Sequence, residues 1–195
     1  MSTLKLTAEN RNGRTVISQS EFTSPLKIAN PFYRDGYTEV MMMAASAGIL
    51  EGDEYDIEIT VRENASLKFT AQSYSKIFKA DKTGAKQRVR ITVENGGSLI
   101  YMPCPVIPFA DSVFGSRTEV RLYGDSRFVM TDILACGRTA MKERFAFKSY
   151  RSRTAVYADD KLCFLDNQKL VPSETELSGI GFFENRSHDV PLRKR

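Results

Sequence analysis

Hydrophobic and polar residues alternate through the middle of the chain in short runs separated by turn residues. Ile59-Thr-Val61 is followed by Arg-Glu-Asn64-Ala-Ser and Leu67, and Ile91-Thr-Val93 is followed by Glu-Asn-Gly96-Gly-Ser and Leu99, a spacing of 32 residues. A period of two predicts half-buried strands. Asn and Gly predict tight turns because they tolerate positive φ. Each copy is therefore predicted to be strand, turn, strand.

Two further copies extend the pattern, a third from Val120 to Phe128 and a weaker fourth from Thr154 to Leu162. A recurring unit of about 30 residues falls in the range of stacked-repeat architectures. We predict a mainly β fold of stacked or layered strand repeats, either β-helix-like or two-layered, with a few short helices. The alternative is a set of similar hairpins of the kind that many β-rich proteins contain.

Helical patterns are weak, and the best window is Thr131–Phe145. Gly137 lies in the middle of it and costs a helix about 1 kcal/mol relative to alanine. A strand, a Gly137-Arg138 turn and a second strand fit equally well, because Phe145 and Phe147 then alternate with Ala146 and Lys148; we favour strands. No low-complexity linker divides the chain. We expect one domain over residues 1–184 and a polar basic tail over residues 185–195.

The composition narrows the function classes. The 195 residues include 28 basic and 24 acidic ones, and a net charge of +4, well mixed along the chain, does not indicate a nucleic-acid partner. No apolar run is long enough to span a membrane, and the N-terminus does not resemble a signal peptide, so we expect a cytoplasmic protein without a membrane partner. The three cysteines, Cys104, Cys136 and Cys163, are expected to be reduced and mostly buried.

Residues for common catalytic chemistry are scarce. The single histidine, His188, falls in the predicted tail, and no phosphate-binding glycine loop is present. We therefore expect a binding or scaffold protein rather than an enzyme. Three carboxylates, Asp53, Asp111 and Glu143, lie beside turns; they are either turn caps and surface charges or oxygen ligands that hold a divalent cation transiently.

A proline-rich segment runs from Met102 to Ser112, with prolines at 103, 105 and 108. Such a segment cannot be helical, and its low conformational entropy reduces the cost of association. We expect Val106, Ile107 and Phe109 either to fill the core or to face a partner, with the core first.

Five motifs in order resemble the UreD (also called UreH) family of urease accessory proteins over residues 4 to 184: Pro31–Tyr33, Ser46–Asp53, Thr70–Phe78, Tyr101–Phe109 and Gly137–Phe145. The resemblance implies stacked β strands and a non-enzymatic scaffold that binds urease apoprotein. It also implies recruitment of UreF and of the nickel GTPase UreG for GTP-dependent nickel insertion. No cofactor would be held tightly, and nickel would pass through an internal water-filled channel.

The resemblance also suggests roles for individual residues. Asp53 and Glu143 are carried over as carboxylates of the nickel passage or of the framework. The remaining motif residues are expected to bind partners or to support the fold: Gln72, Ser73, Lys76, Pro103, Pro105, Ile107, Pro108, Phe109, Gly137 and Arg138.

The end of the chain departs from the family pattern, because family sequences continue past Glu184 into a further apolar region. We expect a C-terminal truncation with an unrelated tail, and such a loss exposes apolar edges and invites aggregation. Two other functions stay open. One is a metallochaperone that binds nickel weakly through its carboxylates and Cys104, and the other is a generic β-solenoid or carbohydrate-binding module.

Overall fold

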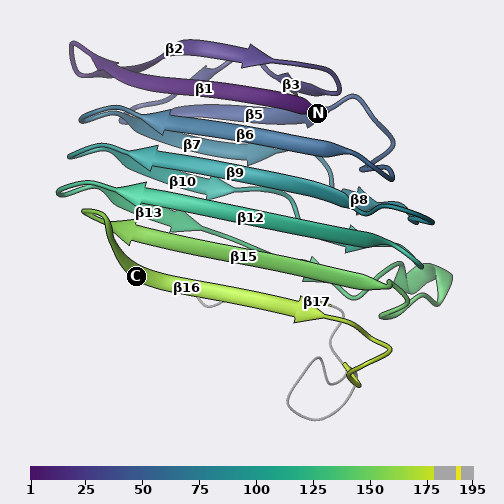
Figure 1. Cartoon of the computed structure of the whole chain (residues 1–195). Coiled ribbons are helices and arrows are strands. Elements are labelled where there is room, and N and C mark those ends of the chain that lie inside the picture. Colours follow the sequence, from purple (N-terminus) through teal and green to yellow (C-terminus); the bar gives the residue numbers. More distant parts are fainter. Residues whose placement is uncertain (178–187, 190–195) are drawn as a thin grey trace.

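The computed structural model describes residues 1–177 and 188–189, and in them strands dominate (Figure 1). No α-helix occurs in the described residues, which contain one 3-10 turn, η1 (Thr139–Met141). The strands are β1 (Ser2–Arg11), β2 (Arg14–Phe22), β3 (Leu26–Ile28), β4 (Phe32–Tyr33), β5 (Thr38–Ala44), β6 (Glu54–Val61), β7 (Ser66–Ala71), β8 (Ser75–Ile77), β9 (Ala85–Val93), β10 (Ser98–Met102), β11 (Val106–Pro108), β12 (Val113–Leu122), β13 (Arg127–Met130), β14 (Leu134–Ala135), β15 (Ser149–Ala158), β16 (Lys161–Leu170) and β17 (His188–Asp189).

The strands form three sheets, and from β6 to β14 consecutive strands pass from one sheet to the next. The seven-stranded sheet has the order β16-β15-β12-β9-β6-β1-β2, the six-stranded sheet β13-β10-β7-β5-β3 with β4 on β5, and the third sheet β17-β14-β11-β8. The coils β6-β7-β8, β9-β10-β11 and β12-β13-β14 stack through parallel pairing. This solenoid-like stack of parallel strands confirms the predicted fold class.

The register confirms the first three repeats. Ile59 pairs with Ile91, and Ile91 with Val120. The fourth copy was placed wrongly by two residues, because Val120 pairs with Val156 and not with Thr154. After its turn, β16 also returns antiparallel to β15 instead of crossing to the opposite sheet. The long connection after β14 changes the spacing at this copy, which explains why the sequence pattern is weak there.

The turns of the repeats stack as closely as the strands. Asn64, with φ of 56°, donates its backbone N–H to the carbonyl of Asn95 at 3.1 Å. The Asn95 side-chain oxygen in turn accepts the backbone N–H of Asp125 at 3.0 Å. Gly124 has a φ of +54°, and a Cβ there would clash with this held Asn95 side chain. Glycine is therefore required by both backbone conformation and close approach.

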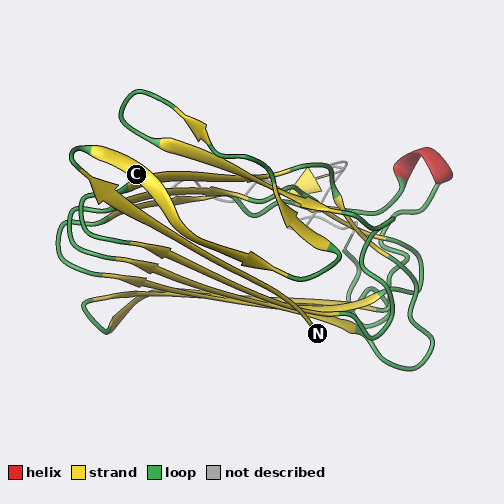
Figure 2. Ribbon diagram, turned by 90° about the horizontal axis from the view of Figure 1, so that it is seen from above, coloured by secondary structure: helices red, strands yellow, loops and turns green. Residues whose placement is uncertain are grey.

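The hydrophobic core lies between the seven-stranded and six-stranded sheets, which face each other when the molecule is seen from above (Figure 2). Inward positions alternate with outward ones along each strand, as the period-two pattern predicted. Its largest fully buried side chains include Leu4, Leu6, Ile57, Ile59, Ile91, Leu67, Phe69 and Leu99.

The strand that we favoured after Gly137 is wrong. Residues 136–148 form a loop that contains η1, and Lys142 and Phe145 have positive φ values of 60° and 52°. Phe145 and Phe147 are both buried, since the loop folds back so that Phe145 donates its N–H to the carbonyl of Cys136 at 2.6 Å. The alternation of Phe145 and Phe147 with their neighbours therefore comes from a loop that buries both rings, and not from a strand.

The proline-rich segment enters the third sheet as β11, between β8 and β14. Val106 packs against the core and Pro108 is buried, whereas Ile107 and Phe109 are half-buried. Of the three residues for which we placed the core role first, Val106 packs against the core, whereas Ile107 and Phe109 are only partly buried.

The three cysteines are free thiols, but only Cys136 is fully buried. Cys104 is half-buried and Cys163 is exposed on the edge strand β16. The expectation that the thiols are mostly buried is therefore wrong for Cys163, whose strand has a neighbour on one side.

Two further predictions concern the C-terminal tail and membrane-spanning segments. The predicted tail over 185–195 lies outside the described residues except for His188 and Asp189, which form β17 and pair antiparallel with β14. The described part of the chain contains no helix that is long and apolar enough to cross a membrane.

The stacked turns generate a stability prediction. Gly124→Ala should lower the free energy of unfolding by about 2 to 4 kcal/mol, because it adds a steric clash to the cost of a left-handed alanine. Gly36→Ala is the matched control, since Gly36 has a φ of +80° with nothing within 4 Å of a Cβ. The control should lose only about 1 kcal/mol in urea unfolding. Equal losses in the two variants would refute the role assigned to turn stacking.

Candidate functional site

One row of inward positions on the seven-stranded sheet is polar, beside rows of buried hydrophobic side chains. The register aligns Tyr55, Gln87, Ser116 and Ser152 in one row across β6, β9, β12 and β15, with Gln168 of β16 opposite Ser152. Tyr55 and Ser152 are only 6% and 7% exposed. A continuous row of hydroxyl and amide groups thus crosses the interior; we call these five residues the polar row.

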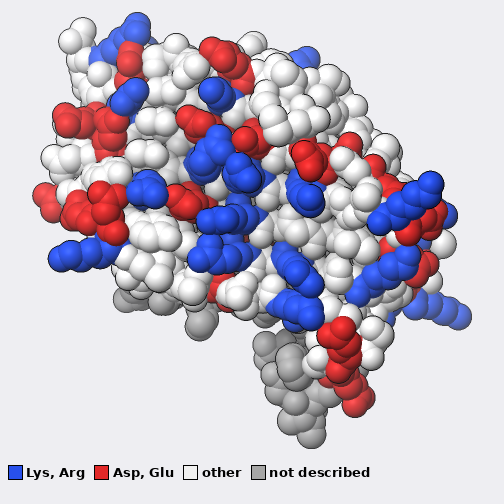
Figure 3. All heavy atoms as spheres, in the orientation of Figure 1, with Lys and Arg blue, Asp and Glu red and all other residues white. Residues whose placement is uncertain are grey.

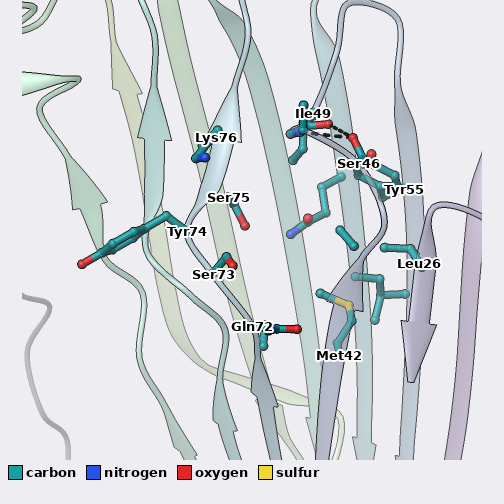
Figure 4. Close-up of a pocket in the computed structure, with 16 residues that line it drawn as sticks. Leu26, Met42, Ser46, Ile49, Tyr55, Gln72, Ser73, Tyr74, Ser75 and Lys76 are labelled. Atoms are coloured by element: carbon teal, nitrogen blue, oxygen red, sulfur yellow. Dashed lines mark hydrogen bonds between the residues drawn. The ribbon is translucent and has the colours of Figure 1, made fainter. Parts of the chain in front are cut away.

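A cavity of about 200 Å³ lies at the β6 and β9 end of the polar row (Figure 4). Tyr55 and Gln87 line it on one side, with Leu26 and Met42 from the strands opposite. Polar groups in a space of this size can hold several water molecules, since each occupies about 30 Å³ in the liquid. The cavity is therefore suited to water and small hydrated species.

Two connecting segments close the cavity. The Gln72–Lys76 segment follows β7, and the small-residue turn at Ser46–Gly48 follows β5; the chain approaches so closely here that a Cβ on Gly48 would clash with the backbone of Lys76. The N–H of Ile49 donates to the carbonyl of Lys76 at 2.8 Å, which joins the two segments. Three predicted motif residues, Gln72, Ser73 and Lys76, thus line one cavity wall, while Tyr74 points away from it (Figure 4).

Asp53 lies beside this cavity, in the turn that precedes β6. Its carboxylate accepts the N–H of Leu50 at 2.8 Å and the hydroxyl of Tyr55 at 3.2 Å. Burial and the neighbouring Asp53 charge together raise the pKa of Tyr55 to about 12. Asp53 therefore closes a turn and also orients the first hydroxyl of the polar row.

Glu143 belongs to a different cluster, in the loop after β14. Its carboxylate forms a two-pronged ion pair with Arg138 and accepts the N–H of Ala110 at 3.3 Å. The Arg138 guanidinium lies over the Phe109 ring, 4.1 Å from its centroid. Gly137 is buried with a φ of +131°, and a Cβ there would approach the Glu143 carbonyl to 2.8 Å. Gly137, Arg138, Glu143 and Phe109 thus fasten the loop to the end of β11; we call them the arginine clamp.

The proline-segment residues link the cavity wall to the arginine clamp. The carbonyl of Pro105 accepts the N–H of Ser75 at 2.9 Å, and Ile107 and Pro108 pair with Lys76 and Ile77. Pro103 is half-buried in the connection from β10 to β11. The structure therefore joins the predicted motif residues through one small parallel sheet, with Asp53 beside the cavity.

Asp132, which the sequence analysis did not identify, supplies a carboxylate near the far end of the polar row. One of its oxygens lies 3.5 Å from the Ser152 hydroxyl. Burial raises the pKa values of Tyr101 and Tyr150, and the nearby Asp132 charge raises both further. A partly buried carboxylate therefore lies at this end of the polar row.

The polar row was also missed, although the sequence contains a signal for it. Gln87 occupies an inward position of a strand in which Ala85, Val89, Ile91 and Val93 are buried. A polar residue at a core-facing position breaks the alternating pattern, and such breaks are typical of functional interiors. Recognition of the row as a whole requires the register between strands, which no single segment contains.

The described residues contain no group of three His, Cys, Asp or Glu side chains that could hold a metal ion. Asp53 and Glu143 are each engaged by protein donors in separate clusters. Their role in nickel passage stays a prediction.

Comparison with known proteins assigns the chain to a family. The family model described as UreD urease accessory protein matches residues 1–188. The chain belongs to the UreD family. It is 42% identical to the urease accessory protein UreD of Acetivibrio thermocellus over 193 residues, which cover 98% of this chain and 74% of that relative. It is 35% identical to the UreH protein of Helicobacter hepaticus (98% and 76% covered) and 32% identical to UreH of Helicobacter pylori strain G27 (93% and 69% covered).

These findings confirm the resemblance stated from the five motifs. The relatives are named accessory proteins of urease rather than enzymes, which is consistent with the expected absence of catalytic activity in this UreD-family chain. That absence itself stays a prediction.

The arginine clamp gives a pH-dependent prediction. The Arg138 hydrogen bonds hold the pKa of Glu143 below its usual value of 4.5, so the ionised carboxylate stabilises the fold above that pH and the contribution disappears as pH falls through the lowered pKa. Glu143→Gln should lower the melting temperature at neutral pH, with a difference from wild type that shrinks in acid. Glu176→Gln, at an exposed position, is the control. A pH-independent difference would contradict the assignment.

Proposed function

We propose that this UreD-family chain acts in urease maturation as a scaffold. It binds the urease apoprotein and recruits a UreF-type accessory protein, and through it a UreG-type nickel GTPase, for GTP-dependent nickel insertion. The observation that carries the proposal is the family match over residues 1–188, together with relatives named urease accessory proteins. We expect the complex to form in the cytoplasm, where free thiols stay reduced.

The fold suits a scaffold because its frame is held by continuous backbone pairing. β6, β9, β12 and β15 pair in parallel over up to ten residues each, and their surfaces are fixed relative to one another. Preorganised surfaces lose little entropy on association. The proline segment adds the same advantage locally, since the arginine clamp holds its end in place.

We further propose that nickel is cargo that crosses the interior along the polar row. It would enter at the cavity between Gln72 and Tyr55 and leave near Ser152 and Asp132. Hydroxyl, amide and single carboxylate oxygens bind a divalent cation weakly, and weak successive sites permit transit. No ion would then be retained, in keeping with the expected lack of a tightly bound cofactor.

Asp53 and Glu143 have indirect parts in this proposal. Asp53 orients the Tyr55 hydroxyl at the entrance, and its carboxylate adds negative charge there. Glu143 fastens the loop after β14 to the end of β11. Both would affect transit through geometry and local charge more than through direct coordination.

Co-expression tests the scaffold role. The tagged chain should retain urease apoprotein and a UreF-type protein through a pull-down, and a UreG-type GTPase only when the UreF-type protein is present. A carbohydrate-binding module would instead retain glycans and ignore these proteins. Retention of neither partner would refute the scaffold proposal.

Substitution within the polar row tests the passage. Gln87→Leu keeps the side-chain size but removes an interior amide, and loss of one polar partner costs about 1 kcal/mol, so nickel loading of urease should fall about fivefold. Partner retention should be unchanged. Gln19→Leu, on the exposed part of β2, is the matched control. Normal loading with Gln87→Leu, measured as nickel per urease site, would contradict the route.

A further inference from the structure

Positive charge gathers on the outer face of the seven-stranded sheet, over β9, β12 and β15 (Figure 3). The register aligns Arg88, Arg117 and Arg153 in one row across these strands. Neighbouring strands lie about 4.8 Å apart, and like charges directly opposite each other are destabilising. The fold therefore places three arginines side by side despite their mutual repulsion.

A second basic row runs beside the first, two residues earlier along each strand. The register aligns Lys86, Gly115 and Arg151, with Lys169 of β16 next to Arg151. In these two rows β9, β12 and β15 contribute no acidic residue. We call the residues Lys86, Arg88, Arg117, Arg151 and Arg153 the basic face.

Most of this charge is not neutralised within the chain. Among the described residues, Arg88, Arg151 and Arg153 form no ion pair. Arg117 has one long contact, 3.9 Å to Glu119, and its side chain is 59% exposed. Of the carboxylates on the next strand, β6, Asp56 and Glu58 both pair with Arg90, and Glu54 makes one long contact of 3.8 Å with Lys86.

Gly115 makes a notch in the middle of the basic face. A Cβ there would meet nothing within 4 Å, so the space above it is open. The notch continues into a shallow groove of about 450 Å³ lined by Lys86, Arg88 and Arg117. A carboxylate placed over Gly115 could reach several cationic side chains at once, and such charge-assisted hydrogen bonds are the strong ones.

We propose that the basic face docks an acidic segment of a protein partner, with one carboxylate of that segment in the Gly115 notch. The proposal rests on the proposed function, since it gives the chemistry of the surface through which a maturation partner binds. Charge complementarity indicates the chemistry of the partner's surface. The basic face has arginines without ion pairs, and Arg is the residue best suited to bind carboxylates.

The surroundings of the basic face favour a short acidic segment over a longer polyanion. Glu54 and Asp56 line the β6 end of the same groove, and Glu119 follows Arg117 on β12. These carboxylates would repel a nucleic-acid backbone or an anionic membrane that extended across the sheet. A protein segment can carry acidic residues over the arginines and other residues beyond them.

Charge substitutions test the docking face in the full chain, co-expressed with urease apoprotein and a UreF-type protein. Gly115→Glu fills the notch with a carboxylate, and Arg117→Glu reverses one charge; each should weaken retention of one partner about tenfold, and wild-type binding should weaken at high salt. Gly115→Gln fills the notch without adding charge, so it should weaken retention less than Gly115→Glu does. Arg127→Glu, an exposed arginine on the opposite sheet, controls for net charge and should bind as wild type does.

The outcomes separate the two proposals. If the wild-type chain retains neither partner, the proposed function fails. If it retains them and the Gly115→Glu and Arg117→Glu variants do so equally well, the scaffold stands and the docking face is wrong. Duplex DNA and phosphatidylserine vesicles are tested alongside, and Arg117-dependent binding to either, with protein retention unchanged, would also overturn the inference.

Discussion

In-register parallel pairing is the constraint on which the rest of this structure depends. Because each coil places its residues directly above those of the previous coil, one position in the repeat becomes a row across the sheet. Side chains alternate between faces, so adjacent rows have opposite surroundings. The aliphatic row from Ile59 to Val156, the polar row and the basic face are three products of the same ladder.

The two inner rows have opposite energetic effects. Fully buried aliphatic side chains such as Ile59 and Ile91 each contribute about 1.5 to 3 kcal/mol. Buried hydroxyl and amide groups destabilise unless they form hydrogen bonds, and the cavity beside Tyr55 and Gln87 gives them access to water. The aliphatic rows thus offset the cost of one polar row that does not stabilise the fold by burial.

Local sequence patterns predicted the strands and turns of the repeats. They could not predict contacts between residues far apart in the sequence. The repeat starting at Ile59 and Ile91 contains its own turn residues, so strand positions and register followed directly. The fourth repeat was displaced because the long connection after β14 changes the spacing, and the hydrophobic residues of that connection imitate a strand. The motif residues near Arg138 could be identified, but the contact of Arg138 with Phe109 could not, since only the fold brings them together. The basic face was hidden because its residues are dispersed along a chain of mixed charge.

Strand β9 contributes neighbouring residues to both the polar row and the basic face. Gln87 faces the interior and belongs to the polar row, while Arg88 faces outward in the basic face. A slip of one residue would exchange the two faces, placing an unpaired guanidinium in the core and exposing the buried Val89 and Ile91. The register that buries the aliphatic rows therefore also fixes the spacing between the interior and the basic face, so a partner bound over Gly115 would lie one sheet thickness from the polar row. The proposed docking face and the proposed passage therefore share one rigid strand.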